Sequence, residues 1–301
     1  MVSVLTAQAK EMVNMGHCRT VPPLIIIGMH RSGTTMVAEM LEQCGLFSGV
    51  KKDPNHESLF FQEKNDWIMH ECGATWDHPE PMHYLADNKE LRTLIKDYLL
   101  RSMKAPAAIR YLGWKKYMQY RSPVSLDIPW GWKDPRNTYT LPIWLDVFPG
   151  AKVIHIFRHG VDVASSLKIR QDKVLAYETA AYEQRKGRYS FKSKNGRFTD
   201  SVRCLTLAGS FSLWEEYMQE ARKRTAGLGD RVREIKYEDF IANPGAMLKD
   251  LTGFCGLTAD EKLIAHAAGN VRTGRAYAYT CDKVLQDFEG QVLSRLRANG
   301  Y

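Results

Sequence analysis

The sequence contains no long apolar run, and this limits where the protein can reside. No stretch of its 301 residues approaches the roughly 20 apolar residues that a membrane-spanning helix needs. The first twenty residues are interrupted by Lys10, Glu11 and Arg19, so they lack the apolar core of a secretory signal. We therefore expect a soluble, cytoplasmic protein without a membrane partner.

Cysteine is scarce and scattered. The six cysteines stand singly, without a CxxC pair and without the spacing of metal ligands. Single cysteines suit a reducing compartment and argue against a disulfide framework or a structural zinc site. The sequence also lacks internal repeats and low-complexity tracts, while 44% of its residues are hydrophobic. We therefore expect residues 1–301 to fold as one domain around a sizeable core.

Acidic residues are outnumbered, but the excess of positive charge is mostly local. The formal net charge is +8, and the segment 183–203, EQRKGRYSFKSKNGRFTDSVR, carries seven basic residues against two acidic ones. Its glycines and serines are typical of a mobile surface loop, which is either simply solvated or a lid over an anionic ligand. Its aromatic residues permit base stacking, yet confinement of the charge to one loop argues against a nucleic-acid partner.

Short β-rich runs alternate with segments of helical period. The runs LIII (24–27), KVIHIF (152–157) and RVREI (231–235) are typical of strands. Helical spacing follows at 36–44 and 161–169, and Asn243 with Pro244 marks the start of a further helix. This alternation predicts an α/β fold of three layers, with a central parallel sheet flanked by helices as in P-loop NTPases.

The predicted sheet brings separate segments to one edge. Gly28 to Thr35, Arg158 and Tyr237 each follow a predicted strand, and ligands of parallel sheets bind at the carboxyl ends of strands. The segment 46–130 includes predicted helices at 59–71 and 88–103. We expect this insert and the segment 171–205 to shape a substrate pocket.

The stretch IIIGMHRSGTT, residues 25–35, is typical of a loop that binds an anion. A strand, Gly28, four residues, Gly33 and a helix direct backbone N–H groups into a concavity, with the positive end of the helix dipole behind them. An ATP or GTP enzyme continues with a lysine, whereas Thr34 follows here. The strand 152–157 ends in Arg158, where a magnesium site needs an aspartate. The loop therefore predicts an anionic ligand that needs no metal.

Four motifs, in order along the chain, resemble those of the sulfotransferases that use 3′-phosphoadenosine 5′-phosphosulfate (PAPS). GMHRSGTTMVAEML resembles their 5′-phosphosulfate loop, in the branch with Arg-Ser-Gly-Thr. FRHGVDVASSL resembles their 3′-phosphate segment, and KYEDFIANP resembles the segment near the adenosine. GWKDP contains the Trp-Lys-Asp-Pro motif of the same branch. The resemblance covers roughly residues 24–245 and implies metal-independent sulfuryl transfer from PAPS, with release of adenosine 3′,5′-bisphosphate (PAP).

The resemblance also implies which residues hold the donor. It assigns the 3′-phosphate to Arg158 and Ser166, the adenosine to Tyr237, and the 5′-phosphosulfate to the loop residues His30, Arg31, Ser32, Gly33, Thr34 and Thr35. The segment VRTGRAY loosely resembles a further 3′-phosphate segment, which makes Arg272 and Gly274 candidates. A structural alternative for Arg158 is an ion pair with Asp162, four residues further along a helix.

Lys133 and Glu57 are the candidate catalytic residues, together with the loop cation Arg31. The branch associates the lysine of Lys-Asp-Pro with charge on the departing oxygen, and Asp134 is a candidate for orienting it. Glu57 precedes a helix in the place where other branches carry a glutamate base. His56 is the alternative base, because an ordinary pKa of about 6.5 suits neutral pH. A bland alternative for either is a charge that complements the helix dipole.

The acceptor stays open among hydroxyl- or amine-bearing small molecules and glycans. A divergent P-loop nucleotide kinase or NTPase is the alternative enzyme. The sequence argues against it, because it has neither the loop lysine nor the strand-end aspartate of such enzymes. A non-catalytic binder of nucleotides or nucleic acid is a third hypothesis, suggested by the basic charge. A homodimer is compatible with the sequence.

Overall fold

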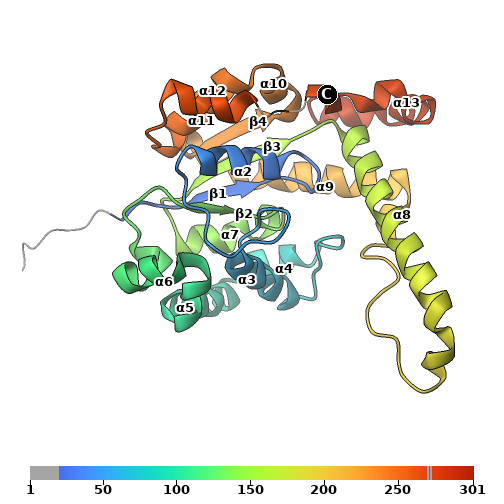
Figure 1. Ribbon diagram of the computed structural model, residues 1–301, viewed down its shortest axis with the longest axis horizontal. Helices are drawn as coiled ribbons and strands as arrows, with labels where there is room; N and C mark the ends of the chain where they lie inside the picture. The colour runs from blue at the N-terminus through green and yellow to red at the C-terminus, as the bar shows by residue number, and fades with distance from the viewer. Residues whose placement is uncertain (1–19, 270, 272) are drawn as a thin grey trace, which may run out of the picture.

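The computed structural model describes residues 20–301 with the exception of 270 and 272, and its centre is a parallel sheet (Figure 1). The sheet has the order β2-β1-β3-β4, and all its neighbouring strands pair in parallel. The strands are β1 (Leu24–Ile27), β2 (Gly131–Lys133), β3 (Lys152–Phe157) and β4 (Val232–Lys236). The three predicted strands are confirmed within one residue, and β2 is an addition.

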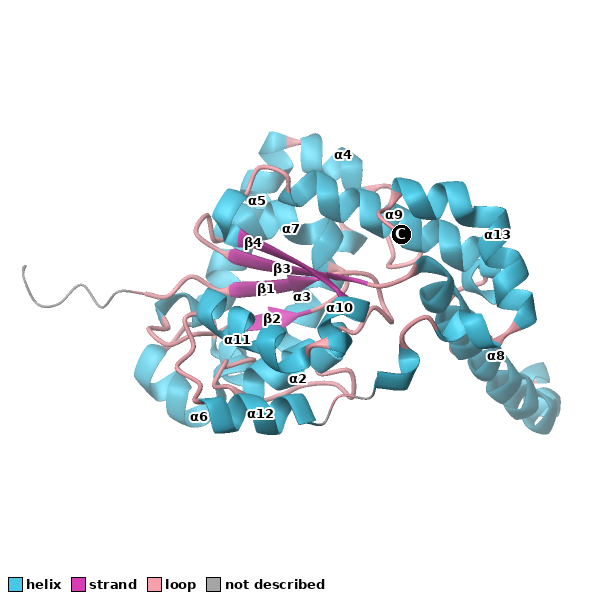
Figure 2. Cartoon of the chain, turned by 90° about the horizontal axis from the view of Figure 1, so that it is seen from above, coloured by secondary structure: helices cyan, strands magenta, loops and turns pink. Residues whose placement is uncertain are grey.

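Alternate residues of the strands face two different helical layers. Leu24 and Ile26 join one buried cluster, whereas Ile25 and Ile27 join another, because successive side chains of a strand point to opposite faces. The two layers lie on opposite sides of the sheet in Figure 2. One consists of α2 (Thr34–Gln43), α11 (Pro244–Cys255) and α12 (Glu261–Gly269), and the other contains α7 (Asn137–Val147) and α9 (Leu207–Thr225). The predicted three-layer α/β fold is confirmed.

The segment between β1 and β2 consists mainly of helices that pack near α7. Its aromatic residues complete the core on that side, where the rings of Phe61 and Trp132 stack 3.9 Å apart. Its helices after α2 are α3 (Leu59–His70), α4 (Met82–Asp87), α5 (Lys89–Lys104) and α6 (Ile109–Tyr120). The helices predicted at 59–71 and 88–103 are therefore confirmed as α3 and α5.

A long helix follows β3 and projects from the body of the molecule (Figure 1). This helix is α8 (Gly160–Arg185), and a 3-10 turn at Lys186–Ser190 leads into the returning chain. Tyr182 packs against Tyr189 and Phe198 across this turn, with ring centroids 5.7 and 5.4 Å apart. We call residues 172–198 the arm. A loop beginning at residue 183 was expected, and this is wrong for 183–190, because helical geometry continues through them.

Two further helices complete the fold. They are α10 (Tyr237–Ala242), directly after β4, and α13 (Lys283–Ala298), which contacts α8 near the end of the chain. Across the described residues, none of the helices combines the length and the apolar character that crossing a bilayer requires.

Candidate active site

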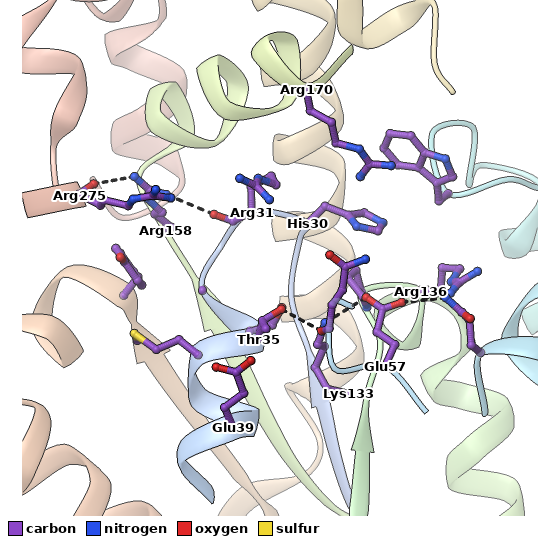
Figure 3. Close-up of a pocket in the computed structure, with 18 residues that line it drawn as sticks. His30, Arg31, Thr35, Glu39, Glu57, Lys133, Arg136, Arg158, Arg170 and Arg275 are labelled. Carbon is purple, nitrogen blue, oxygen red and sulfur yellow. Dashed lines mark hydrogen bonds and ion pairs between the residues drawn. The ribbon is translucent and has the colours of Figure 1, made fainter. Parts of the chain in front are cut away.

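A cavity of about 630 Å³ opens at the carboxyl ends of the strands, where the loop after β1 meets the starts of α8 and α10. Figure 3 shows its side chains converging from both halves of the sheet. Two carboxylates, Glu39 and Glu57, line it. Six cations also line it, namely Arg31, Lys133, Arg136, Arg158, Arg170 and Arg275. Lys133, Arg136, Arg158 and Arg170 are paired with carboxylates, but the lining itself still carries more positive than negative charge, which favours an anionic ligand.

The loop between β1 and α2 forms the floor of the cavity. Arg31 and Gly33 have left-handed backbone angles, with φ of 71° and 92°, so the loop turns sharply before α2 begins. A Cβ atom at Gly33 would lie 2.4 Å from the ring of Tyr237. The close approach of loop and tyrosine therefore requires glycine at this position. The start of α2 behind the loop adds the positive end of a helix dipole.

Several buried polar atoms around the loop have no hydrogen-bond partner among the described residues. They are His30 Nε2, Ser32 Oγ and Arg158 Nε. Burial, followed by the charges of Arg170 and Arg136, holds the pKa of His30 well below its ordinary value, so this ring is neutral at pH 7. Ser32 itself does not line the cavity, but Arg158 does, and an oxyanion bound there offers the acceptor that Arg158 Nε lacks. The residues present thus fit a phosphosulfate donor.

Arg158 connects the loop with the C-terminal part of the chain. Its guanidinium donates to the carbonyl oxygens of Arg31, at 3.4 Å, and Arg275, at 2.6 Å, and it lies over the ring of Tyr237. It also forms an ion pair of 3.0 Å with Asp162. The structural alternative for Arg158 is therefore real, but it does not exclude ligand binding, because Arg158 Nε stays unpaired and the side chain lines the cavity.

Arg31 and Ser166 are in direct contact. Arg31 Nε donates to Ser166 Oγ at 2.8 Å, so the loop is tied to α8 by the two residues that the motifs had singled out separately. Ser166 itself does not line the cavity. Thr34 and Thr35 line it from the first turn of α2, and Thr35 Oγ1 donates to the carbonyl oxygen of Asn55 at 3.0 Å.

Glu57 and Lys133 form a buried ion pair on the opposite side of the cavity from Arg158 (Figure 3). Lys133 Nζ lies 3.0 Å from Glu57 Oε1, and Arg136 Nη2 lies 3.3 Å from Glu57 Oε2. Burial raises the pKa of Glu57 to about 7, and the charge of Asp134 adds to the rise, although Lys133 and Arg136 act in the opposite direction. Glu57 therefore titrates near neutral pH, which is the range that a general base needs.

The expected pairing of Asp134 with Lys133 is wrong. The Asp134 carboxylate accepts hydrogen bonds from Arg136 Nε, at 2.9 Å, and from Asn65 Nδ2, at 2.8 Å, whereas Lys133 pairs with Glu57. Lys133 is the last residue of β2, and neighbouring side chains at a strand end point in different directions. Asp134 therefore orients Arg136, and Arg136 in turn pairs with Glu57, the same carboxylate that Lys133 contacts.

His56 lies outside the cavity. Its ring nitrogens contact Glu42 and Glu39 on α2, the latter at 3.4 Å, and its Nε2 lies 3.1 Å from Lys52 Nζ. The left-handed backbone of His56, with φ of 66°, turns its side chain toward α2 while Glu57 faces the cavity. The two candidate bases are thus adjacent in sequence but point to different surroundings.

Of the two C-terminal candidates, Gly274 falls within the described residues. Arg272 lies outside the described residues, and Gly274 is exposed and does not line the cavity. Arg275 does line it, and the segment that follows is fixed to α8, because the backbone N–H groups of Ala278 and Tyr279 donate to Asp162 at 3.2 and 2.9 Å. Arg275, which the sequence analysis did not name, is the described residue of this segment that lines the cavity.

Besides Arg275, the sequence analysis did not predict two other arginines of the cavity, Arg136 and Arg170. Arg136 follows Lys-Asp-Pro directly, and Arg170 lies four residues after Ser166 on α8, hence on the same helix face. Both residues lie just beyond the motifs GWKDP and FRHGVDVASSL, and their closeness to motif residues was the available signal. The predicted residues that do line the cavity are His30, Arg31, Gly33, Thr34, Thr35, Glu57, Lys133, Arg158 and Tyr237.

Most of the chain matches the model of one protein family. The model of the sulfotransferase family matches residues 22–261, which include the loop, Lys133, Arg158 and Tyr237. The chain belongs to the sulfotransferase family. An uncharacterized protein of Aquifex aeolicus (strain VF5) is 24% identical to this family member over 245 residues, which are 81% of this chain and 26% of that protein. The chain therefore spans about a quarter of the length of this relative.

Solved structures similar to this family member include three sulfotransferases. The sulfotransferase domain from the curacin biosynthetic pathway is 15% identical with a TM-score of 0.49, covering 91% of this chain and 98% of the domain. The domain from the Synechococcus PCC 7002 olefin synthase is 17% identical, with a TM-score of 0.46 and coverages of 94% and 95%. A sulfotransferase from Alicyclobacillus acidocaldarius is 16% identical, with a TM-score of 0.45 and coverages of 92% and 95%.

Proposed function

We propose that the protein transfers the sulfuryl group of PAPS to a hydroxyl or amine of a small molecule or glycan, without a metal, and releases PAP. The observation that carries this proposal is the cavity itself. It combines six cations, unpaired buried donors around the loop, and a carboxyl of raised pKa beside a lysine. Anion binding and proton acceptance are the two functions that this transfer requires.

The loop side of the cavity suits the 5′-phosphosulfate. Backbone N–H groups at the start of α2 and the side chain of Arg31 would surround its oxygens, and Thr34 and Thr35 line the same end of the cavity. Arg158 and Arg275 lie next to Tyr237 at the other end of the loop, which suits the 3′-phosphate and the adenosine. This assignment places the sulfuryl group toward Glu57 and Lys133, at the remaining end of the cavity.

We assign the base to Glu57 rather than to His56, since Glu57 lines the cavity and its pKa is about 7. In the transfer, the acceptor oxygen forms a bond to sulfur, the bond between sulfur and the bridging oxygen of the donor breaks, and Glu57 takes the acceptor proton. Lys133 stabilises the charge left on the bridging oxygen. As Glu57 becomes neutral, its attraction for Lys133 weakens, so proton uptake frees the ammonium where negative charge develops.

Thermal denaturation with added ligand tests the proposal. A ligand that binds only the folded chain raises the midpoint by mass action, so PAP is expected to raise it and ATP with Mg²⁺ is not. Arg158→Ala and Arg275→Ala should each abolish or strongly reduce the PAP shift. Arg101→Ala, on the exposed surface of α5, is the matched control and should keep it. A shift with ATP and Mg²⁺ but none with PAP would show instead a nucleotide kinase or NTPase.

A further inference from the structure

Three smaller hollows lie beside the cavity and share lining residues with one another, and we call them together the groove. Their volumes are about 440, 180 and 310 Å³. Asp66 and His70 line both the first and the second hollow, and Arg197 lines both the second and the third. The groove thus runs along α3 and ends at the chain that returns from the arm.

The groove reaches the cavity at two residues. Gln62 lines both the first hollow and the cavity, and its side-chain amide donates to Glu57 Oε2 at 3.3 Å. Trp76 lines both the second hollow and the cavity, where its ring lies 5.0 Å from that of His30. The end of the groove at Gln62 therefore lies next to the carboxyl that we assign as the base.

The length of the groove favours an extended ligand. Its first part alone follows α3 from Leu59 to His70, which at 1.5 Å per residue is about 16 Å. The groove then continues past Trp76 to Val202. A single phenol or sugar ring fills only a fraction of this distance, whereas a chain of linked rings follows it.

The charges of the groove differ from those of the cavity. Four carboxylates line it against two arginines, and three of the four are neutralised by ion pairs. Glu63 pairs with Arg110, Asp66 with Arg136, and Asp200 with Arg170. Ion-paired carboxylates keep free lone pairs that accept hydrogen bonds from hydroxyls, while the groove offers little net attraction to an anion.

We propose that this groove binds the acceptor and that the acceptor is an uncharged oligosaccharide of two or more rings. The inference rests on the proposed function, because it takes Glu57 as the base. Trp67 and Trp76 line the groove, Trp67 with Tyr98 packed against its ring and Trp76 with Arg170 over its ring, and their remaining apolar surface would contact sugar rings. The polar side chains between them would accept from and donate to hydroxyls. The cationic cavity holds the anionic donor, and the groove beside it holds an uncharged acceptor.

A glycan array tests this inference with the full chain saturated with PAP. The array presents neutral, amino and uronic-acid oligosaccharides of increasing length. We expect retention on neutral glycans, rising with chain length beyond one ring, and none on the uronic-acid series. The affinity for the best neutral glycan is then measured by calorimetry. His70→Ala and Arg197→Ala should each weaken it about tenfold, the effect of losing one hydrogen bond.

The controls separate the inference from the proposed function. Lys173→Ala, at an exposed position on the arm, should leave glycan affinity unchanged, and all three variants should keep the PAP thermal shift. Tighter binding to uronic-acid chains, an unaltered affinity in both groove variants, or no retention on any glycan while PAP still stabilises the chain would each overturn the inference alone. Failure of PAP to stabilise the wild-type chain would overturn the proposed function, and the inference with it.

Discussion

At the scale of single residues, Glu57 has surroundings unlike those of an ordinary surface carboxylate, because it is buried beside Lys133 and Arg136. Burial and Asp134 raise its pKa to about 7. Since a base acts only when it is deprotonated, kcat/KM for sulfuryl transfer should rise with pH up to about 7 and fall tenfold per pH unit below it. Glu57→Gln should lower kcat by about 10² to 10⁴-fold and remove this dependence.

The measurement is PAP release as a function of pH. Glu71→Gln, at the exposed end of α3, is the control and should retain the wild-type profile. If Glu57→Gln keeps a wild-type rate and profile, another group accepts the proton and the assignment of Glu57 is wrong.

Lys133 should affect the pH dependence of the reaction as well as its rate, because it lies beside Glu57. Lys133→Ala removes a positive charge 3.0 Å from Glu57, while burial and Asp134 remain, so the pKa of Glu57 should rise further. We expect kcat to fall about 10² to 10³-fold and the acid limb of kcat/KM to move to higher pH. Lys115→Ala, exposed on α6, should change neither quantity. A loss of rate without movement of the acid limb would mean that Lys133 and Glu57 are not coupled.

Site residues could be predicted from the sequence where a motif specifies both the residue type and its position after a strand. The loop residues, Arg158 and Tyr237 follow predicted strands, and parallel strands bring their carboxyl ends together, so their meeting in one cavity was predictable. The pairing of Lys133 with Glu57 was not, because these residues are 76 positions apart and their contact depends on how the insert folds back. Asp134, adjacent in sequence to Lys133, was the wrong partner for the same reason.

At the scale of elements, the loop before α2 depends on one close contact. Gly33 has φ of 92°, and an added Cβ would lie 2.4 Å from the ring of Tyr237. Gly33→Ala should therefore destabilise the fold by about 1 to 3 kcal/mol and abolish the PAP shift, because Tyr237 and the loop must separate. Gly45→Ala is the matched control. Its φ is 103°, but no atom lies within 4 Å of the added Cβ, so it should keep the PAP shift.

Denaturant unfolding and thermal denaturation with PAP measure these two effects. If Gly33→Ala and Gly45→Ala behave alike, backbone strain alone accounts for both, and the contact with Tyr237 is not needed for binding.

Sequence patterns predicted several elements, although the long helices α9 and α13 were not among them. The runs 24–27 and 152–157 became β1 and β3, and the helices at 59–71 and 88–103 became α3 and α5. The strand β2 has only three residues, too few for a periodic signal. The arm was missed because the glycines and serines after residue 186 are typical of a loop, whereas local aromatic packing of Tyr182 folds the turn.

At the scale of the whole molecule, the arm is separable from the body. Its aromatic contacts and the ion pair of Lys194 with Glu178 lie within the arm itself. At its base, Thr199 Oγ1 donates to Gln171 Oε1 at 2.9 Å, so the two ends of the arm already meet. Replacement of residues 173–198 by a short Gly-Ser linker should therefore leave the fold intact, with a midpoint within about 3 °C of wild type.

The shortened chain also distinguishes binding of PAP in the cavity from binding of a glycan in the groove. It keeps the cavity residues, including Arg170, so the PAP thermal shift should be unchanged, whereas it loses Arg197, so affinity for a neutral glycan should fall about tenfold. It also loses seven basic and two acidic residues, so it should elute from a cation exchanger at lower salt. A fall in the midpoint of more than about 10 °C would show that the arm belongs to the folding core. A lost PAP shift with an unchanged midpoint would show instead that the arm closes over the donor.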